Sequence, residues 1–515
     1  MVHVQWSGMD RQQIEAHGLT IEEVERQLAL LRSGVSPAEL VRPCTPGDGI
    51  LVLDADTRQQ MIDRFNRVRS RYRILRFVPA AGAATRMWRD LYAIRDTLRS
   101  GQTLDAVLRE KMQRFFHNLH RFAFYEALDR VIRRRGERLS DLLESHAYAR
   151  ILDYLLEPGG LGYGDMPKGL VPFHRYPDRP RTAAEEHLVE ATVHACGSVP
   201  TAVVHFVTRA DHALRFRSFL DQVKHRYETT CRIHLEWSIQ SPSTDTVAID
   251  GAGRIVRDAN GRILFRPGGH GALLSNLNRL DADLVFVKNI DNVAMDAYKP
   301  ATFEAFGMLG GVIITVREAI TALLQRVTAG TPIDMWLPDA EVLLRRYFFT
   351  DMDTVCARVP DRDPRQAILR FFDRPLRVCG MVRNVGEPGG GPFWVRMPNG
   401  EVLPQIVESA QVDLDHPKYR EIWNGATHFN PVVMVLAMRD GRGRPYDLFR
   451  FSEPEMAFIT EKYFRGQPIR ALEHPGLWNG GMAYWRTIFV EIPRAAFNPV
   501  KTVFDLLRPE HQQTP

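Results

Sequence analysis

An apolar strand that runs directly into small residues is the feature that most constrains this chain. Residues 77–87 read FVPAAGAATRM, and residues 87–92 have the character of a helix. The small side chains at this turn are Ala80, Ala81, Gly82 and Ala83. Backbone N–H groups at a strand-to-helix turn point outward and favour negative charge, and small side chains let an anion come close to them. Thr85 adds a hydroxyl donor and Arg86 a charged fork suited to phosphate, so we predict that this turn holds the phosphates of a nucleotide.

Composition indicates a globular intracellular protein. With 515 residues and 44% hydrophobic content, the chain can bury a large core and is expected to form two or three domains. We find no signal-peptide pattern at the start, and no uninterrupted apolar run approaches the roughly 18–20 residues of a membrane span. The 5 cysteines are scattered and form no Cys-x-x-Cys pair, which predicts reduced thiols, a cytoplasmic location and neither a disulfide framework nor a zinc cage.

The charge pattern argues against nucleic acid as a partner. The formal net charge is only +5, and the basic residues are interspersed with 62 acidic ones. Nucleic-acid-binding proteins usually concentrate Lys and Arg on one face. The small excess of positive charge fits a small anionic substrate equally well.

Strands and helices alternate in the middle of the chain. Strand patterns at 202–207, 233–239 and 283–290 are separated by helical patterns, one of which begins at the capping box Thr182-Ala183-Ala184-Glu185. Such alternation predicts an α/β fold with a mostly parallel central sheet and ligands at the carboxyl ends of its strands. We expect an N-terminal helical region at 1–75, an α/β core at 76–450 with a helical insertion at about 103–157, and a C-terminal extension at 451–515 that packs on the core.

Other candidate site residues lie where such a sheet would need them. Lys168 stands in a turn between Pro167 and Gly169, which suits a contact to phosphate, although an ordinary surface lysine has the same pattern. Asp291 ends an apolar strand and is either a Mg²⁺ ligand or a helix cap. Asp245 is the candidate for a second metal ligand. A further glycine-rich turn contains Gly268, Gly269, His270 and Gly271.

Two other functional interpretations are less well supported by the sequence. Glu186, Glu190 and His194 lie four residues apart on one helix face and could bind a metal, but we expect a solvated face with a Glu–His pair. A Ser/His/Asp hydrolase would need a Gly-x-Ser-x-Gly elbow, and the sequence has none.

The motifs together resemble a known family over nearly the whole chain. They are residues 77–87, Pro167-Lys168-Gly169, residues 243–246, residues 266–273, residues 288–292, Gly386–Phe393, residues 427–431 and residues 477–480. This set resembles the bacterial domain of unknown function 4301. More distantly, the order of motifs is similar to that of the UDP-sugar pyrophosphorylases, which have the nucleotide-diphospho-sugar transferase fold.

This resemblance implies roles for individual residues. Gly82, Thr85 and Arg86 would grip the triphosphate, with Lys168 beside the α-phosphorus and Asp291 as the metal ligand. Residues 268–271 would contact base or ribose, and Glu408 and Asn430 the acceptor. His270 stands where Asn is usual, and Ser409-Ala410-Gln411 replaces a Tyr-Ser-Glu sequence, so base and sugar both stay open. Alanines replace glycines at positions 80, 81 and 83, so the loop must avoid positive φ there or bear strain.

The sequence therefore predicts a Mg²⁺-dependent nucleotidyltransferase. It would join a nucleoside triphosphate to a small phosphorylated acceptor, such as a sugar 1-phosphate, and release pyrophosphate. Two alternatives remain open, namely a glycosyltransferase of the same fold and a non-catalytic nucleotide sensor. The oligomeric state is not indicated.

Overall fold

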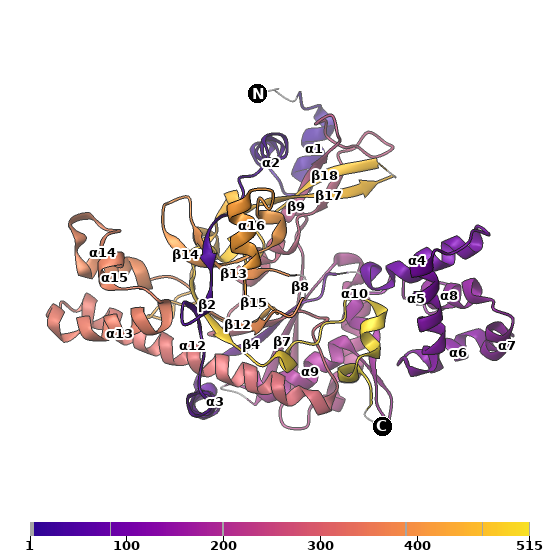
Figure 1. Ribbon diagram of the computed structural model, residues 1–515, viewed down its shortest axis with the longest axis horizontal. Coiled ribbons are helices and arrows are strands. Elements are labelled where there is room, and N and C mark those ends of the chain that lie inside the picture. Colours follow the sequence, from indigo (N-terminus) through magenta and orange to yellow (C-terminus); the bar gives the residue numbers. More distant parts are fainter. Residues whose placement is uncertain (1–4, 83, 198–199, 387–388, 466, 514–515) are drawn as a thin grey trace. The chain divides into compact units, whose positions relative to one another are not determined.

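The chain folds into two compact units, each built from three stretches of sequence. The structure is a computed structural model that describes residues 5–82, 84–197, 200–386, 389–465 and 467–513. Unit 1 comprises Met1–Val68, Gln240–Val287 and Phe306–Ile492, and unit 2 comprises Arg69–Ile239, Lys288–Ala305 and Pro493–Pro515. Helices and strands alternate in both units, which confirms the predicted α/β class (Figure 1).

Unit 2 contains a row of parallel strands. β4 (Ile74–Pro79), β7 (Thr201–Thr208) and β8 (Arg232–Ile239) lie side by side in that order, with Leu75 opposite Val203 and Ala202 opposite Ile233. β4 is buried along almost its whole length, as expected for a parallel strand covered on both faces. A short hairpin is formed by β5 (Pro172–Arg175) and β6 (Pro180–Thr182). The parallel arrangement predicted for this part of the chain is therefore present.

Unit 2 also contains several helices. They are α4 (Thr85–Arg99), α5 (Ala106–His117), α6 (Tyr125–Arg134), α7 (Leu139–Glu144), α8 (Tyr148–Leu156), α9 (Ala183–His194) and α10 (Ala210–Val223). The helical character predicted for 103–157 is confirmed by α5 to α8, which form one group with α4 in Figure 1. α9 begins at the predicted capping box, because Thr182 and Glu185 exchange side-chain and backbone hydrogen bonds.

The largest row of strands in unit 1 is mixed. It contains β2 (Thr45–Pro46), β3 (Gly49–Leu51), β19 (Arg486–Glu491), β12 (Leu376–Arg383), β16 (Val433–Ala437) and β11 (Leu284–Lys288), in that order. β2, β3, β19 and β12 pair in parallel, whereas β12 and β16 pair antiparallel. β15 (His428–Phe429) also runs antiparallel to β12. The mostly parallel arrangement is thus shown only in part.

Two smaller sheets complete unit 1. One joins β1 (Glu39–Pro43), β13 (Gly391–Arg396) and β14 (Val402–Val407), and the other joins β10 (Phe265–Pro267), β9 (Asp245–Ile249), β18 (Gln467–Glu473) and β17 (Phe458–Phe464). α1 (Gly8–Ala16) and α2 (Ile21–Ser33) pack on the second sheet through a shared core that includes Leu28, Val247 and Leu472. The other helices of unit 1 are α3 (Ala55–Val68), α11 (Leu274–Asn278), α13 (Leu337–Phe348), α14 (Met352–Cys356), α15 (Pro364–Phe372) and α16 (Pro417–Asn424).

α12 (Lys299–Thr328) is the longest helix of the described residues. The helical segment Asp296–Thr328 is long and apolar enough to cross a membrane, but 61% of its most apolar window is buried inside the protein. Core helices of globular proteins have the same length and composition, so this segment is weak evidence for a membrane span.

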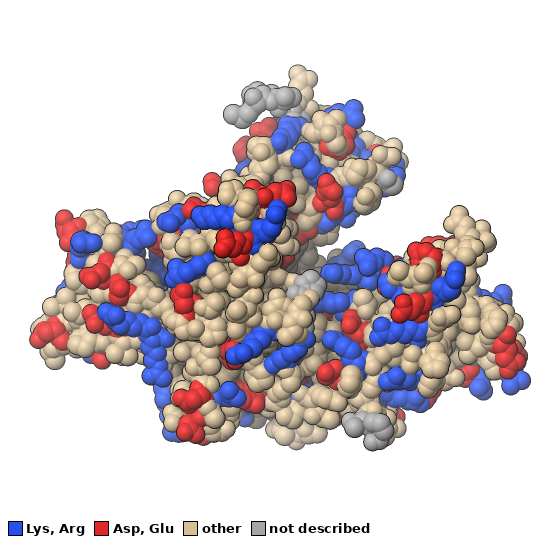
Figure 2. Space-filling model, in the orientation of Figure 1, with Lys and Arg blue, Asp and Glu red and all other residues tan. Residues whose placement is uncertain are grey.

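On the face shown in Figure 2, Lys and Arg are interspersed with Asp and Glu.

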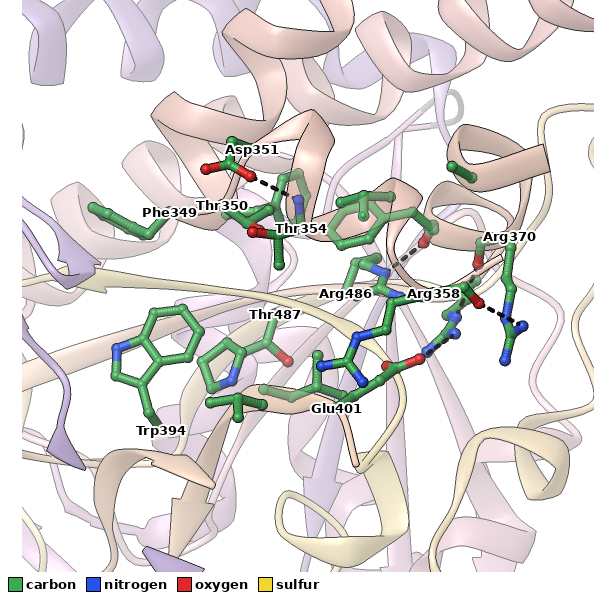
Figure 3. Close-up of a pocket in the computed structure, with 18 of the residues that line it drawn as sticks. Phe349, Thr350, Asp351, Thr354, Arg358, Arg370, Trp394, Glu401, Arg486 and Thr487 are labelled. Carbon is green, nitrogen blue, oxygen red and sulfur yellow. Dashed lines mark hydrogen bonds and ion pairs between the residues drawn. The ribbon is translucent and has the colours of Figure 1, made fainter. Parts of the chain in front are cut away.

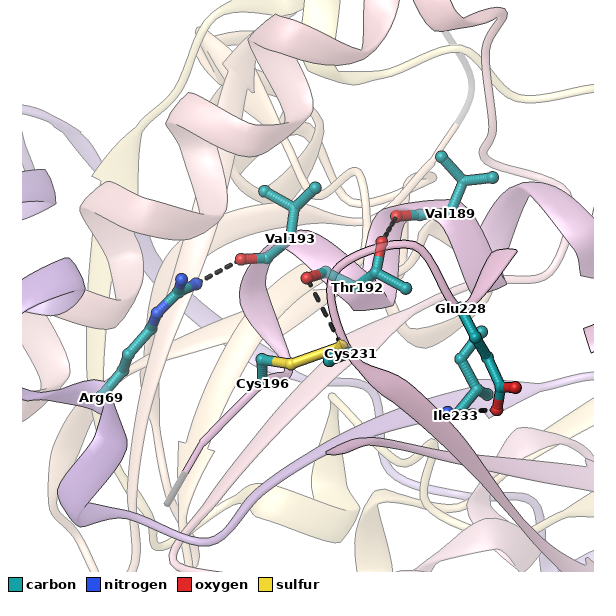
Figure 4. Close-up of a disulfide and its surroundings, with 8 residues drawn as sticks. All are labelled: Arg69, Val189, Thr192, Val193, Cys196, Glu228, Cys231 and Ile233. Atoms are coloured by element: carbon teal, nitrogen blue, oxygen red, sulfur yellow. Dashed lines mark hydrogen bonds between the residues drawn. A yellow bond between two sulfur atoms is a disulfide. The ribbon is translucent and has the colours of Figure 1, made fainter. Parts of the chain in front are cut away.

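The cysteine prediction was wrong at one pair. Cys196, just after α9, and Cys231, just before β8, form a disulfide, and their Cα atoms are 6.9 Å apart (Figure 4). Cys44, Cys356 and Cys379 are free and buried. The pair was missed because the two residues are 35 positions apart and become neighbours only when the end of α9 meets the start of β8.

Candidate functional site

One face of α9 carries charged side chains into the interior of unit 2. Glu186 and Glu190 are fully buried and His194 is 2% exposed, so the prediction of a solvated face was wrong. Glu190 accepts hydrogen bonds from Arg76 of β4 at 2.5 Å and from Lys288 at the end of β11 at 2.9 Å. Buried charges need such partners, because an unpaired ion in the interior is very costly. The helical periodicity of the sequence predicted that these residues share a face, but it did not indicate the cations that allow the face to be buried.

This buried network holds the segment that follows β11. Burial, followed by the charge of Arg76, lowers the pKa of His187, so its neutral ring accepts from Arg76 at Nδ1 and donates from Nε2 to the carbonyl of Ile290 at 3.2 Å. Lys288 is anchored on Glu190 only three residues before Asp291. The position of Asp291 is therefore set by buried hydrogen bonds and ion pairs on the residues before it.

Asp291 lies between two lysines of unit 2. Its Oδ2 accepts from the Nζ of Lys168 at 2.7 Å and from the Nζ of Lys501 at 3.1 Å. Burial alone would raise the pKa of Asp291, but the charges of Lys168 and Lys501 lower it to about 2. The other oxygen, Oδ1, is buried and has no hydrogen-bond partner within the described residues. The cluster thus has one more positive than negative charge, and it has one carboxylate oxygen left for a ligand.

The turn that carries Lys168 packs directly on this segment. A Cβ at Gly169 would lie 2.6 Å from the ring of Phe216 and 3.1 Å from Cδ1 of Ile290, so only glycine allows this close approach. Lys168 is only 8% exposed, and burial lowers the pKa of its ammonium while Asp291 opposes that shift. Its environment is therefore not that of an ordinary surface lysine in a turn.

The predicted phosphate loop reaches the same cluster through its backbone. The N–H of Lys168 donates to the carbonyl of Gly82 at 3.5 Å. Gly82 is exposed, with open space where a Cβ would lie. α4 begins after Ala84 without a side-chain cap, which leaves the first N–H groups of the helix available to an anion. The structure therefore brings this loop, Lys168 and Asp291 together in unit 2.

The loop residues differ in their exposure. Thr85 and Arg86 are exposed in the first turn of α4, whereas Ala80 is buried and donates its N–H to the carbonyl of Val207 at 2.9 Å. Neither Ala80 nor Ala81 has a positive φ, so alanine is compatible with the loop at both positions. Ala83 lies outside the described residues, as do positions 387 and 388 of the later glycine-rich motif.

Lys501 was missed by the sequence analysis. The N–H of Val500 donates to the carbonyl of Asp291 at 3.0 Å, and that of Asn498 to Oδ1 of Asn292 at 2.8 Å. These bonds hold the C-terminal segment against residues 291–292. Lys501 is 210 positions from Asp291 and belongs to no motif, so no local signal could have identified it.

A second group of predicted residues meets in unit 1. Nε2 of His270 lies 3.3 Å from Oε1 of Glu408, and the His270 ring stacks on Trp478 with 4.1 Å between centroids. Nδ1 of His270 accepts from the N–H of Leu477 at 2.9 Å, so a neutral ring carries its proton on Nε2, facing Glu408. Asn430 is 7% exposed, and its N–H donates to the carbonyl of Gly390 at 2.8 Å. Both ring nitrogens of His270 are directed at protein groups, so the partly exposed Glu408 carboxylate is the member of this pair that can hydrogen-bond hydroxyl groups of a ligand.

The glycines of the 268–271 turn have a structural explanation. Gly269 has φ +75°, and a Cβ there would lie 2.4 Å from the carboxylate of Glu473. Cβ atoms at Gly268 and Gly271 would lie 2.4 Å or less from backbone oxygens of Thr244 and Pro475. The turn therefore needs glycine in order to pack against the chain around residues 473–475.

The donor set for a metal is small. Within the part of the chain that the structure describes, no three His, Cys, Asp or Glu side chains are grouped so that they could hold a metal ion. Asp245 belongs to unit 1, where its carboxylate lies 3.7 Å from Nε2 of His17. The unpaired Oδ1 of Asp291 can supply one ligand to a metal ion that binds together with a phosphate group.

Residues 7–512 match the family described as Domain of unknown function (DUF4301). The chain belongs to this family. The predicted membership is thereby confirmed for nearly the whole DUF4301 chain. No curated protein matches this chain.

Several solved structures are similar to this DUF4301 protein. A variant of UDP-glucose pyrophosphorylase from Leishmania major in complex with UDP-glucose has 12% identity and a TM-score of 0.42, and the match covers 98% of this chain and 79% of that one. Uridine diphosphate N-acetylglucosamine pyrophosphorylase from Trypanosoma brucei, in complex with inhibitor, has 13% identity, a TM-score of 0.45, and coverages of 98% and 79%. UDP-glucose phosphorylase from Trypanosoma brucei has 12% identity, a TM-score of 0.45, and coverages of 98% and 81%. At these values the similarity identifies neither a substrate nor an activity of the DUF4301 chain.

Proposed function

We propose that this protein is a Mg²⁺-dependent nucleotidyltransferase that joins a nucleoside triphosphate to a phosphorylated small molecule, such as a sugar 1-phosphate. The observation that supports it best is the cluster of Lys168, Asp291 and Lys501 beside the backbone of Gly82. A lysine pair, an open glycine turn and a helix N-terminus are all suited to a polyphosphate.

The proposed reaction needs positioning and charge neutralisation more than covalent help. An oxygen of the acceptor phosphate attacks the α-phosphorus in line, the bond from that phosphorus to the bridging oxygen breaks, and pyrophosphate leaves. Lys168 and Lys501 offset the charge that develops around the α-phosphorus, while Arg86 and the backbone at 82–85 hold the departing phosphates. Such preorganised charges act strongly where water is excluded.

Asp291 would hold the Mg²⁺ ion through its unpaired Oδ1. When bound, the ion would supply further neutralisation of phosphate charge, and a single protein carboxylate is compatible with the way Mg²⁺ is shared with substrate phosphates. In unit 1, residues 268–271 keep their proposed role toward base or ribose, and Glu408 and Asn430 their proposed role toward the acceptor.

The test is pyrophosphate release by the purified protein with Mg²⁺, a panel of triphosphates and a panel of sugar 1-phosphates. We expect release with at least one pair, and its loss in Asp291→Ala. Asp178→Asn, which changes an exposed carboxylate of unit 2, should keep full release. A folded wild-type protein that releases no pyrophosphate across both panels would contradict the proposal.

One observation favours the second candidate, a non-catalytic nucleotide sensor. Lys168 and Lys501 already occupy Oδ2 of Asp291, and a site with net positive charge binds a polyphosphate without needing a metal. Triphosphate binding that is unchanged by EDTA, together with no turnover, would favour the sensor over the transferase.

A further inference from the structure

A cavity lies entirely within unit 1. Its volume is about 330 Å³, which is at the lower end of the range of small-molecule sites. α13, α14 and α15 form one wall, and β13, β14 and the start of β19 form the other. None of the residues that we assign to nucleotide, metal or acceptor lines it.

The lining has an excess of positive charge. It contains Arg42, Arg358, Arg370, Arg374 and Arg486 but only Asp351 and Glu401 as acids. Arg42 pairs with Asp48 at 2.7 Å, and Arg374 lies 3.5 Å from Glu401. Within the described residues, no carboxylate forms an ion pair with Arg358, Arg370 or Arg486, so three guanidinium groups lack an anionic partner.

Arg486 is the most unusual of the three. It is 4% exposed, stacks on the ring of Phe371 at 3.7 Å, and donates from Nε to the carbonyl of the same residue at 2.5 Å. Burial, with the charge of Arg374, lowers the pKa of Arg486, which means that its charged form is destabilised at this depth. The indole N–H of Trp485, which also lines the cavity, is buried without a hydrogen-bond partner in the described chain. A bound anion would relieve the buried charge.

Aromatic rings give the cavity an apolar part. Figure 3 shows Trp394 on one side, Arg370 on the other, and Arg358, Arg486 and Glu401 between them. Phe349, which also lines the cavity, directly follows α13 and has φ +51°. This conformation is strained for a bulky residue, and such strain is concentrated at functional sites.

The cavity lies at the amino ends of two parallel strands, because Arg486, the first residue of β19, pairs with Leu376, the first residue of β12. Ligands of α/β sheets usually bind at the carboxyl ends of the strands, so this cavity is not at the usual ligand position.

We propose that this cavity is a separate binding site for a small phosphomonoester that carries a planar apolar group. A phosphate dianion matches unpaired guanidinium forks, which bind its oxygens in a bidentate manner. Phe371 on the helical wall and Trp394 on the strand wall supply apolar surface for the planar part. A site of this kind, away from the Lys168–Asp291 cluster, would let a phosphorylated metabolite influence the protein without competing for the nucleotide site.

The test is calorimetric titration with phenyl phosphate, with inorganic phosphate and benzyl alcohol as the charged and apolar halves. We expect phenyl phosphate to bind more tightly than either half, and the double variant Arg358→Gln/Arg370→Gln to lose at least tenfold in affinity. Both arginines are exposed at the rim, so this variant should fold. Arg346→Gln, an exposed arginine of α13 that does not line the cavity, is the matched control and should bind normally.

Two further variants separate this site from the nucleotide site. Thr354→Trp, which fills the cavity without a change of charge, should abolish binding, whereas Lys168→Met should leave it unchanged. Titration with uridine monophosphate and adenosine monophosphate then tests whether the natural ligand is a nucleotide or another aromatic phosphate. Absence of phenyl phosphate binding, or equal affinity in wild type and the double arginine variant, would overturn the proposal. Neither result depends on whether the protein transfers nucleotides.

Discussion

The two lysines beside Asp291 should respond differently to removal of their charge. Lys168→Met and Lys501→Met each keep an unbranched apolar side chain and delete the ammonium group. Lys168 has 10% of its side chain exposed and Lys501 46%. Because both contact the same oxygen, a comparison of the two variants separates the effect of burial from that of contact.

The structure sets the size of the expected difference. At 2.7 Å and an effective dielectric constant of about 20, the attraction between Lys168 and Asp291 is about 6 kcal/mol, and desolvation of the lysine offsets a large part of it. Removing one partner of a buried pair costs about 3–5 kcal/mol, and Lys501 remains as a second partner of Asp291, so we expect about 3 kcal/mol for Lys168→Met. Lys501 at 3.1 Å is screened by solvent, so Lys501→Met should cost about 1 kcal/mol or less.

Calorimetric melting is the assay for stability. For a domain of the size of unit 2, each kcal/mol shifts the melting temperature by about 2–4 °C, which predicts a loss of about 6–12 °C for Lys168→Met and less than about 4 °C for Lys501→Met. Both variants should lose triphosphate affinity, and Lys224→Met, a surface lysine of unit 2, should lose neither affinity nor stability. If Lys501→Met is as unstable as Lys168→Met, or if both retain wild-type affinity, the reasoning is refuted.

Three other outcomes are expected. Glu190→Gln should lower the free energy of unfolding by about 3–5 kcal/mol, because it leaves two buried cations without their carboxylate; an unchanged melting curve would contradict the buried network. Since burial lowers the pKa of Lys168 below its ordinary value of 10.5 and only the protonated form attracts phosphate, triphosphate affinity should fall as pH rises toward 10. Lys168→Met should lack this dependence, and a parallel decline in both proteins would exclude Lys168 as its cause. Thiol titration of the denatured, unreduced protein should detect the 3 free cysteines and not Cys196 or Cys231, and detection of every cysteine before reduction would contradict the disulfide.

The sequence was informative where function depends on local chemistry. The strand–turn–helix at 74–99, the turn around Lys168 and the strand end at Asp291 each have a recognisable pattern, and the structure brings their backbones or side chains together in unit 2. The parallel row of unit 2 likewise follows from the alternation of strand and helix patterns.

What the sequence could not supply depends on contacts between distant residues. Lys501 reaches Asp291 only because backbone hydrogen bonds hold the C-terminal segment in place. The polar face of α9 has the periodicity of a solvated helix, and the cations that allow it to be buried come from β4, from the end of β11 and from the start of α12. The antiparallel pairing of β12 with β15 and β16 joins residues that are far apart in the sequence, which no periodicity shows.

The most direct measurement is a crystal structure of the protein with a non-hydrolysable nucleoside triphosphate and Mg²⁺. We expect phosphate density beside the backbone of Gly82 and the ammonium groups of Lys168 and Lys501, with the ion at Oδ1 of Asp291. Phosphates bound in the arginine-lined cavity of unit 1 instead, with the Lys168–Asp291–Lys501 cluster unchanged, would contradict it.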